Sequence, residues 1–286
     1  MSNQNLPIAE GDKINHKEIE DYKDRINKML SDLNDPNTFK SIEEKIKLEV
    51  TDTTLTDKKL NVFLSILGKK LSQLKDKTNG IKIIKTVAVS LKQIDVYLSK
   101  LLTIIQTIIT EENRDFYMLL ASTFGDIVSI TKNIVLEKSM VYEILQGFCF
   151  YNIRRDTTAH QLCGSLCLEY FIKNCPLVQN PVNLKFIWEN ICVAIENTEF
   201  KAKTEILSAL KTLIVSADIR IQPYAVPTLY KVFDILSDTD WYRKKLVLNI
   251  IHQLTLAAPN DIIPLKSYIT DYLMIAKNDK VLYIII

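Results

Sequence analysis

Apolar residues recur at three- and four-residue spacing along nearly the whole chain after residue 15. This spacing places apolar side chains on one face of an α-helix, so it predicts amphipathic helices rather than strands. Short polar stretches rich in Asn, Asp, Pro or charged residues separate the helical segments. The predicted segments are 19–33, 42–50, 60–67, 81–91, 96–109, 116–134, 141–153, 159–172, 184–195, 206–215, 226–236, 246–256 and 262–275. The pattern therefore predicts an all-α protein of six helix pairs and one further helix.

The predicted pairs begin at regular intervals along the sequence. They begin near His16, Leu55, Ile94, Lys138, Pro181 and Ile221. A period of about 40 residues is typical of HEAT and armadillo repeats, whereas ankyrin and TPR repeats are shorter. Because one pair cannot cover its own apolar faces, neighbouring pairs must stack. We expect a right-handed α-solenoid of about six HEAT-like pairs, forming a single array over residues 16–286 after a disordered leader at residues 1–15.

The composition agrees with a helical solenoid and excludes some classes of function. Only 6 Gly and 8 Pro occur among 286 residues, which leaves little material for hairpin turns. The net charge of +2 excludes a strongly basic nucleic-acid binder, so electrostatic recognition must depend on local charge. Five cysteines without a CxxC pair indicate reduced, buried thiols. The polar first residues and the lack of a long apolar run predict a cytoplasmic protein without a membrane span.

Basic residues gather in the predicted turns within each pair. The candidate partner-binding residues are Lys77, Arg114, Arg154, Arg155, Lys201, Lys203, Trp241, Arg243 and Lys244. The connections between pairs are neutral or mildly acidic instead. Stacked pairs place all within-pair turns on one edge, so we expect a basic edge suited to a partner with an extended acidic surface. Each basic turn taken alone is more typical of an ordinary solvated helix end, and it is their shared edge that favours a binding surface.

The two tryptophans have different surroundings in the sequence. Trp241 stands between Asp240 and Tyr242 at a predicted helix start, where an exposed Trp would suit an interface anchor, although a core position is also possible. Trp188 shares a helical face with Ile191 and Ile195, so we expect it in the core.

The late part of the sequence resembles TOG domains, and in particular the plant Spiral/Tortifolia type of microtubule-associated protein. The similar segments are Phe200-Lys201-Ala202-Lys203, Asp240-Trp241-Tyr242-Arg243-Lys244-Lys245, Pro264-Leu265-Lys266 and Asp279-Lys280-Val281. The resemblance covers roughly residues 55–281. It implies a six-repeat HEAT array that binds tubulin through its within-repeat loops.

Two features depart from the TOG pattern. TOG domains carry an exposed Trp in the first repeat, whereas Phe39-Lys40 stands nearest to that place here. The family continues after the Asp-Lys-Val segment with polar, basic sequence, whereas this chain ends in the apolar residues 282–286. This ending suggests a fragment or an altered terminus.

Residues for catalysis or metal binding are sparse. The three histidines fall in three different repeats, and no GxxxxGK[ST] or GxGxxG motif occurs. His160, Cys163 and Cys167 share one helical face, but structural zinc sites take four ligands, so we interpret these three as small packed side chains. We therefore expect no enzyme activity, no metal, no cofactor and no small-molecule substrate.

Three functional hypotheses follow. The first is a cytoskeletal protein that binds αβ-tubulin or microtubules through the basic edge and regulates microtubule dynamics. The second is a HEAT-repeat scaffold or transport adaptor that binds a protein or peptide along its concave helical surface. The third is a nucleic-acid-associated HEAT protein, against which the near-zero net charge argues. The fold alone does not decide among them.

Overall fold

The structure is a computed structural model that describes residues 16–52, 54–110 and 113–277. Within these ranges every regular element is helical and no strand occurs, so the predicted all-α class is confirmed. The predicted leader at residues 1–15 and the apolar segment 282–286 lie outside the described residues. The chain divides into two compact units, Met1–Lys92 and Gln93–Ile286, and each is described here by itself.

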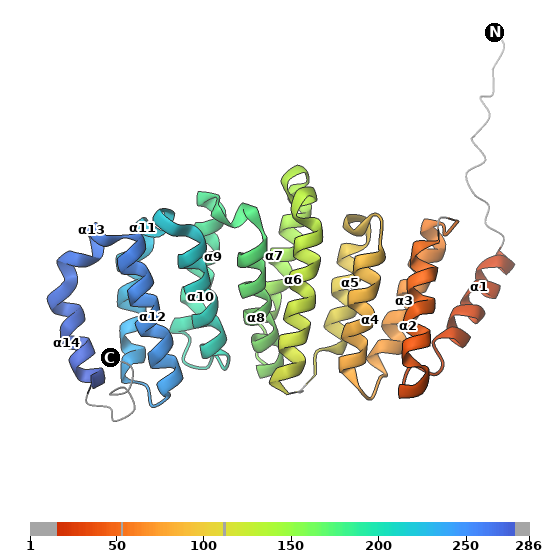
Figure 1. Cartoon of the computed structure of the whole chain (residues 1–286), viewed down its shortest axis with the longest axis horizontal. Coiled ribbons are helices and arrows are strands. Elements are labelled where there is room, and N and C mark those ends of the chain that lie inside the picture. Colours follow the sequence, from red (N-terminus) through yellow and green to blue (C-terminus); the bar gives the residue numbers. More distant parts are fainter. Residues whose placement is uncertain (1–15, 53, 111–112, 278–286) are drawn as a thin grey trace, which may run out of the picture. The chain divides into compact units, whose positions relative to one another are not determined.

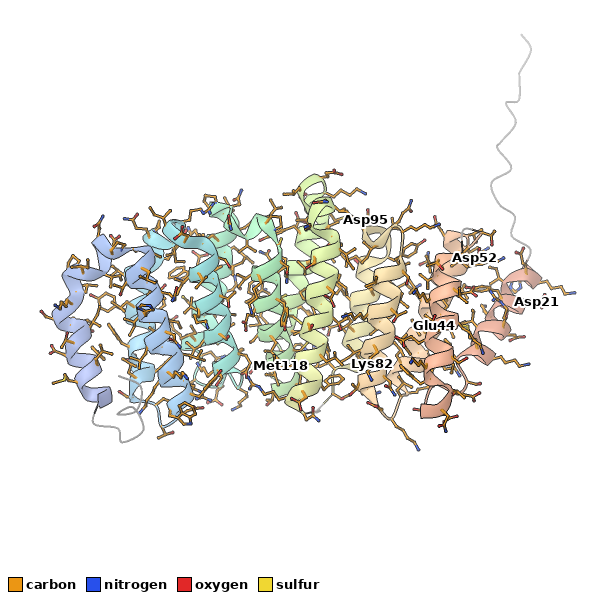
Figure 2. The ribbon with its side chains drawn as sticks, in the orientation of Figure 1. Asp21, Glu44, Asp52, Lys82, Asp95 and Met118 are labelled. Carbon is orange, nitrogen blue, oxygen red and sulfur yellow. The ribbon has the colours of Figure 1, made fainter. Side chains whose placement is uncertain are left out.

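The described part of the first unit contains four helices (Figure 1, with side chains in Figure 2). They are α1 (His16–Met29), α2 (Pro36–Thr51), α3 (Asp57–Ser72) and α4 (Lys77–Ser90). Asp35, Thr56 and Asp76 cap the N-termini of α2, α3 and α4 by accepting hydrogen bonds from backbone N–H groups. Helix α1 packs on α3 and α2 packs on α4, so the first two helices each contact the helix two places further along the chain.

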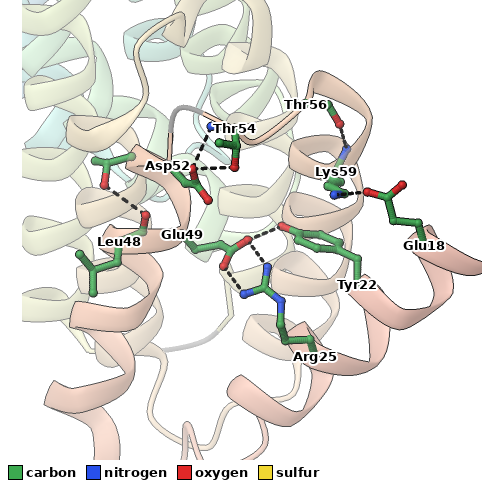
Figure 3. Close-up of polar contacts among 10 residues, drawn as sticks. Glu18, Tyr22, Arg25, Leu48, Glu49, Asp52, Thr54, Thr56 and Lys59 are labelled. Atoms are coloured by element: carbon green, nitrogen blue, oxygen red, sulfur yellow. Dashed lines mark hydrogen bonds and ion pairs between the residues drawn. The ribbon is translucent and has the colours of Figure 1, made fainter. Parts of the chain in front are cut away.

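A buried carboxylate links α1 to α2 in this unit (Figure 3). The Arg25 guanidinium donates to both Glu49 carboxylate oxygens, at 2.8 and 2.7 Å, and the Tyr22 hydroxyl donates to Glu49 Oε1 at 2.9 Å. Burial, the Glu49 charge and this hydrogen bond together raise the pKa of Tyr22. The bidentate pair satisfies a carboxylate that would otherwise be costly to bury.

The second unit contains the remaining helices. They are α5 (Ile94–Ile108), α6 (Arg114–Glu137), α7 (Ser139–Ile153), α8 (Thr158–Asn174), α9 (Pro181–Glu196), α10 (Lys203–Ala217), α11 (Gln222–Phe233), α12 (Trp241–Ala257), α13 (Pro259–Ile262) and α14 (Lys266–Lys277), with short 3₁₀ turns at Pro176–Gln179, Asp218–Ile221, Asp234–Ser237 and Ile263–Leu265. Side chains of Asn113, Thr157, Asn180 and Asp240 cap α6, α8, α9 and α12.

These helices form two layers in the second unit. The first helices of the pairs pack in sequence, α5 on α7 and α9 on α11, and the second helices pack likewise, α6 on α8, α8 on α10 and α10 on α12. Each pair also packs internally, as α7 does on α8 and α9 on α10. Figure 1 shows α6, α8, α10 and α12 side by side in the nearer layer. The apolar core lies between the two layers.

Helix α8 is the most tightly packed element of the second unit. A Cβ atom added to Gly164 would lie 2.7 Å from Ile153 N and 2.8 Å from Cys149 O, so only glycine allows this approach of α8 to α7. A Cβ on Gly125 of α6 would lie 2.6 Å from the Tyr170 ring of α8. The five cysteines are free and buried, as predicted.

Helix α6 is the one helix in the described part that is long and apolar enough to span a membrane by length and composition. Half of its most apolar stretch is buried within the structure, and the helix packs against α7 and α8. It therefore has the packing of a core helix.

The predicted helices are all present within a few residues of their expected limits, with one correction. The last predicted helix, 262–275, is interrupted: α13 ends at Ile262, a 3₁₀ turn contains Pro264, and α14 begins at Lys266. Proline lacks an N–H and clashes with the preceding turn, so a continuous helix is disfavoured there. The predicted period is also visible in long-range hydrogen bonds, such as Trp188 Nε1 to Thr228 Oγ1, which joins residues 40 apart.

Candidate partner-binding edge

The within-pair turns of the second unit lie along one edge of that unit (Figure 1). We use the name turn edge for residues 154–157, 197–202 and 234–240, together with the first turns of α8, α10 and α12 that follow them. The connections from α8 to α9 and from α10 to α11 lie on the opposite edge. This separation is the geometry that makes a linear surface from residues distant in sequence.

Polar side chains hold successive turns in fixed positions relative to one another. The buried Gln161 amide donates to Arg155 O at 2.9 Å and accepts from Lys201 N–H at 2.7 Å, which joins two consecutive turns. Arg243 Nε donates to Thr204 Oγ1 at 3.5 Å, which joins the start of α12 to the start of α10. The turn edge is therefore pre-organised rather than a set of independent loops.

Two aromatic side chains stand exposed on the turn edge. Trp241 is 47% exposed and Tyr242 is 44% exposed, with ring centroids 5.8 Å apart at an interplanar angle of 83°. The Asp240 carboxylate caps α12 by accepting from the backbone N–H groups of Tyr242 and Arg243. This cap fixes the helix start and thereby places both rings at the edge.

A cleft of about 960 Å³ opens on the same edge, between the α9–α10 turn and the α11–α12 turn. Its charged lining comprises Glu196, Lys201, Lys203, Lys231, Asp234, Asp238 and Arg243. Apolar walls come from side chains such as Phe200 and Tyr230. The cleft thus offers apolar surface beside alternating charges.

Ion pairs organise the charges of this cleft. Arg243 Nη1 lies 2.9 Å from Asp238 Oδ2, and Lys231 pairs with Glu196. Burial alone would raise the pKa of Asp238, but hydrogen bonds from the Asp240 backbone and from Arg243 hold it below its usual value. Burial and the nearby Arg243 charge lower the pKa of Lys203. The cations here are therefore largely compensated by neighbouring carboxylates.

Several candidate residues have structural roles that the sequence did not reveal. The Lys203 ammonium donates to the carbonyls of Ala194 and Ile195 and so caps the end of α9. In the first unit, Lys77 Nζ donates to Ser72 O at 2.6 Å and to Leu71 O at 3.4 Å, capping α3 in the same way.

The prediction that Lys244 is a partner-binding residue needs correction. It is only 6% exposed on α12, on the face that packs inward, so it is not available to a partner. Its neighbour Arg243 remains at the surface of the cleft.

The predicted basic character of the edge also needs correction, because its charge is mixed. Arg114 Nη1 lies 2.5 Å from Glu205 Oε1, and Lys201 Nζ lies 3.5 Å from Glu199 Oε2. Arg154 and Arg155 differ from these, since they have no carboxylate partner within the described ranges. Arg154 donates to the Asn190 amide at 2.8 Å, and the Arg155 guanidinium lies 5.5 Å from the centre of the Tyr151 ring.

Sequence reasoning missed Gln161 and did not select Tyr242 as a site residue. The Gln161 bridge gives no local sequence signal, because its partners belong to two different turns. Trp188 packs between α9 and α11, where its ring lies 4.9 Å from that of Tyr224, but it is only half-buried. It contributes to packing at the rim of the core rather than at its centre.

In the described part of the chain, no group of three or more His, Cys, Asp and Glu side chains is arranged to hold a metal ion. His160 Nδ1 lies 2.6 Å from Thr157 Oγ1, while the Cys163 and Cys167 sulfurs lie 4.0 Å apart in the core. The His160 ring therefore contacts Thr157, whereas the two cysteine sulfurs lie in the core, although all three residues share one helical spacing.

The fold and this edge define a class of protein: stacked helix pairs that carry exposed aromatic and arginine side chains on one edge of turns. The sequence matches the TORTIFOLIA1 N-terminal family over residues 20–284. The chain belongs to this family, which is a family of microtubule-associated proteins of HEAT and TOG type. The resemblance to the Spiral/Tortifolia type is thus confirmed.

An engineered protein of known crystal structure, from a structural genomics consortium, is 12% identical and has a TM-score of 0.44; the match covers 82% of this chain and 98% of that one. No curated protein matches the sequence.

Proposed function

We propose that this chain is a right-handed HEAT-type α-solenoid that binds αβ-tubulin or microtubules through its turn edge and thereby regulates microtubule dynamics. It acts in the cytoplasm at the cytoskeleton, as a binding protein rather than an enzyme, without a cofactor. Membership of a microtubule-associated family supports the partner. The observation that carries the choice of surface is the exposed Trp241–Tyr242 pair beside the charged cleft.

The balance of charge suggests how this edge binds. Because most cleft cations already have carboxylate partners, long-range attraction comes mainly from Arg154 and Arg155. The aromatic pair then supplies apolar contact area, which in protein interfaces is concentrated in a few Trp, Tyr and Arg residues. Binding should therefore depend on the aromatic anchor at all salt concentrations and on the two arginines mainly at low salt.

The test measures co-elution of the purified chain with αβ-tubulin by size-exclusion chromatography at low and moderate salt. The double substitution Trp241→Ala and Tyr242→Ala should weaken binding by about tenfold or more, as expected for hot-spot truncation. Exposed Ile219, on the opposite edge, provides the matched apolar control as Ile219→Ala.

The charge variant is Arg154→Glu with Arg155→Glu, and its control is Arg220→Glu on the opposite edge. We expect the first to weaken binding at low salt and the second to leave it unchanged. Loss of binding in the controls alone, or full binding by a correctly folded aromatic variant, would contradict the proposal. Circular dichroism establishes that each variant is folded.

A further inference from the structure

The outward face of the second-helix layer carries a row of exposed apolar side chains, away from the turn edge. Ile130 in the second half of α6, Val215 on α10 and Leu256 on α12 are 40%, 55% and 64% exposed. Lys173 occupies the corresponding position on α8. We call Ile130, Val215 and Leu256 the apolar row; Lys173 interrupts it on α8. The equivalent positions in the first unit are Leu48 and Val89, which are also exposed.

The row follows from the repeat itself. The solvent-facing residues of α10 are Thr204, Ser208, Lys211 and Val215, and those of α12 are Lys245, Asn249, His252 and Leu256. Each residue of the second set lies 41 positions after its counterpart in the first. Since α10 packs directly on α12, equivalent residues are neighbours across the two helices.

The register between α8 and α10 is fixed by a hydrogen bond. Thr212 Oγ1 donates to Glu169 Oε1 at 3.4 Å. Lys173 and Val215 each lie about one turn further along their own helices, so they too are neighbours. The line of equivalent positions therefore continues from α12 across α10 to α8, where a lysine stands beside the apolar pair Val215 and Leu256.

The charge beside the row is mainly positive in this part of the unit. Lys211 lies one turn before Val215 and has no carboxylate partner within the described ranges. Lys173 lies beside Val215 and pairs with Glu169 of its own helix at 2.6 Å. An apolar row flanked by lysines fits an occupant with one apolar side and acidic residues next to it.

We propose that this face of α8, α10 and α12 is a second binding site, which takes an acidic amphipathic α-helix laid across the three helices. Packed helices lie about 8–10 Å apart, which matches the rise of about 10.5 Å between residues i and i+7 of a helix. Leucines at that spacing would contact Leu256 and Val215 in turn. Glutamates beside them would face Lys211 and Lys173.

The probe is a fluorescein-labelled synthetic peptide of about 21 residues with leucines every seventh position and glutamates beside them, its length set by the helical rise. Fluorescence anisotropy measures its affinity for the full chain. We expect binding that Val215→Ser with Leu256→Ser weakens on the order of tenfold. Both substituted residues are exposed, so the fold should tolerate the change, and circular dichroism checks this.

The matched control is Val182→Ser with Val193→Ser, since both valines are well exposed on α9 in the other layer. This variant should bind the peptide like the unaltered chain. Lys211→Glu should weaken binding and reduce its salt dependence. The row variant should still co-elute with αβ-tubulin, because the turn edge is intact.

Three peptide controls decide the chemistry of the occupant. A peptide with the leucines scrambled off one face, one with lysines in place of glutamates, and one with a central proline should each bind more weakly. Equal binding by the scrambled peptide, the basic peptide or the proline peptide would overturn the apolar, acidic or helical part of the proposal respectively. Absence of binding by the designed peptide would overturn the site itself.

Discussion

Replacement of Gly164 by alanine tests the close contact between α7 and α8. An added methyl group would lie 2.7 Å from Ile153 N, 2.8 Å from Cys149 O and 2.9 Å from Asn152 Cβ. Two of these three atoms belong to the backbone, which cannot rotate away as a side chain can. Helix α8 must therefore move outward or the surrounding backbone must deform.

The size of the effect follows from two opposing contributions. Overpacking of a well-packed core costs about 1–3 kcal/mol. Alanine favours a helix over glycine by about 1 kcal/mol, which offsets part of that cost. We expect Gly164→Ala to lower the free energy of unfolding of the second unit by up to about 2 kcal/mol, on the balance of these two contributions.

Gly147 on α7 provides a matched control, because nothing lies within 4 Å of a Cβ added there. Gly147→Ala should retain the helix-propensity gain alone and raise stability by up to about 1 kcal/mol. Urea denaturation followed by tryptophan fluorescence is the assay, since Trp188 and Trp241 both belong to the second unit. Gly164→Ala should therefore be about 1–3 kcal/mol less stable than Gly147→Ala, and equal stability of the two variants would show that the close contact does not exist as described.

Three further effects are expected. Arg25→Ala removes two hydrogen bonds to the buried Glu49 carboxylate and leaves the one from Tyr22, so it should lower the stability of the first unit by about 1–3 kcal/mol in denaturant titrations followed by circular dichroism. Burial raises the pKa of Cys175 to about 11, so stability present below pH 9 should fall by about 2–3 kcal/mol as the pH rises to 11, and Cys175→Ser should flatten that fall. Asp218 has φ of 52°, so Asp218→Gly should raise the melting temperature, and a decrease would contradict the strain inferred there.

Helix positions could be predicted from the sequence because each helix buries one stripe of apolar residues, and that stripe repeats every three to four residues. The interruption at Pro264 was missed for the same reason. Ile262, Ile263 and Leu265 continue the apolar pattern across the proline, so periodicity alone does not show the break.

The charge of the turn edge could not be predicted with the same success, because ion pairs depend on residues far away in the chain. Arg114 pairs with Glu205, which lies 91 positions further along the chain, so no local sequence pattern predicts the contact. Lys244 is different, since a signal was present. It lies three residues before Val247 and ten before Leu254, on the buried stripe of α12, so helical phase already placed it inside.

Hydrogen–deuterium exchange of the full chain with and without αβ-tubulin tests the central proposal most directly, because it reports which edge the partner covers. We predict slower exchange at residues 154–157, 197–202 and 234–242, and unchanged exchange at the opposite edge, 175–180 and 218–221. Protection confined to the opposite edge, or to the outward faces of α8, α10 and α12, would contradict binding through the turn edge.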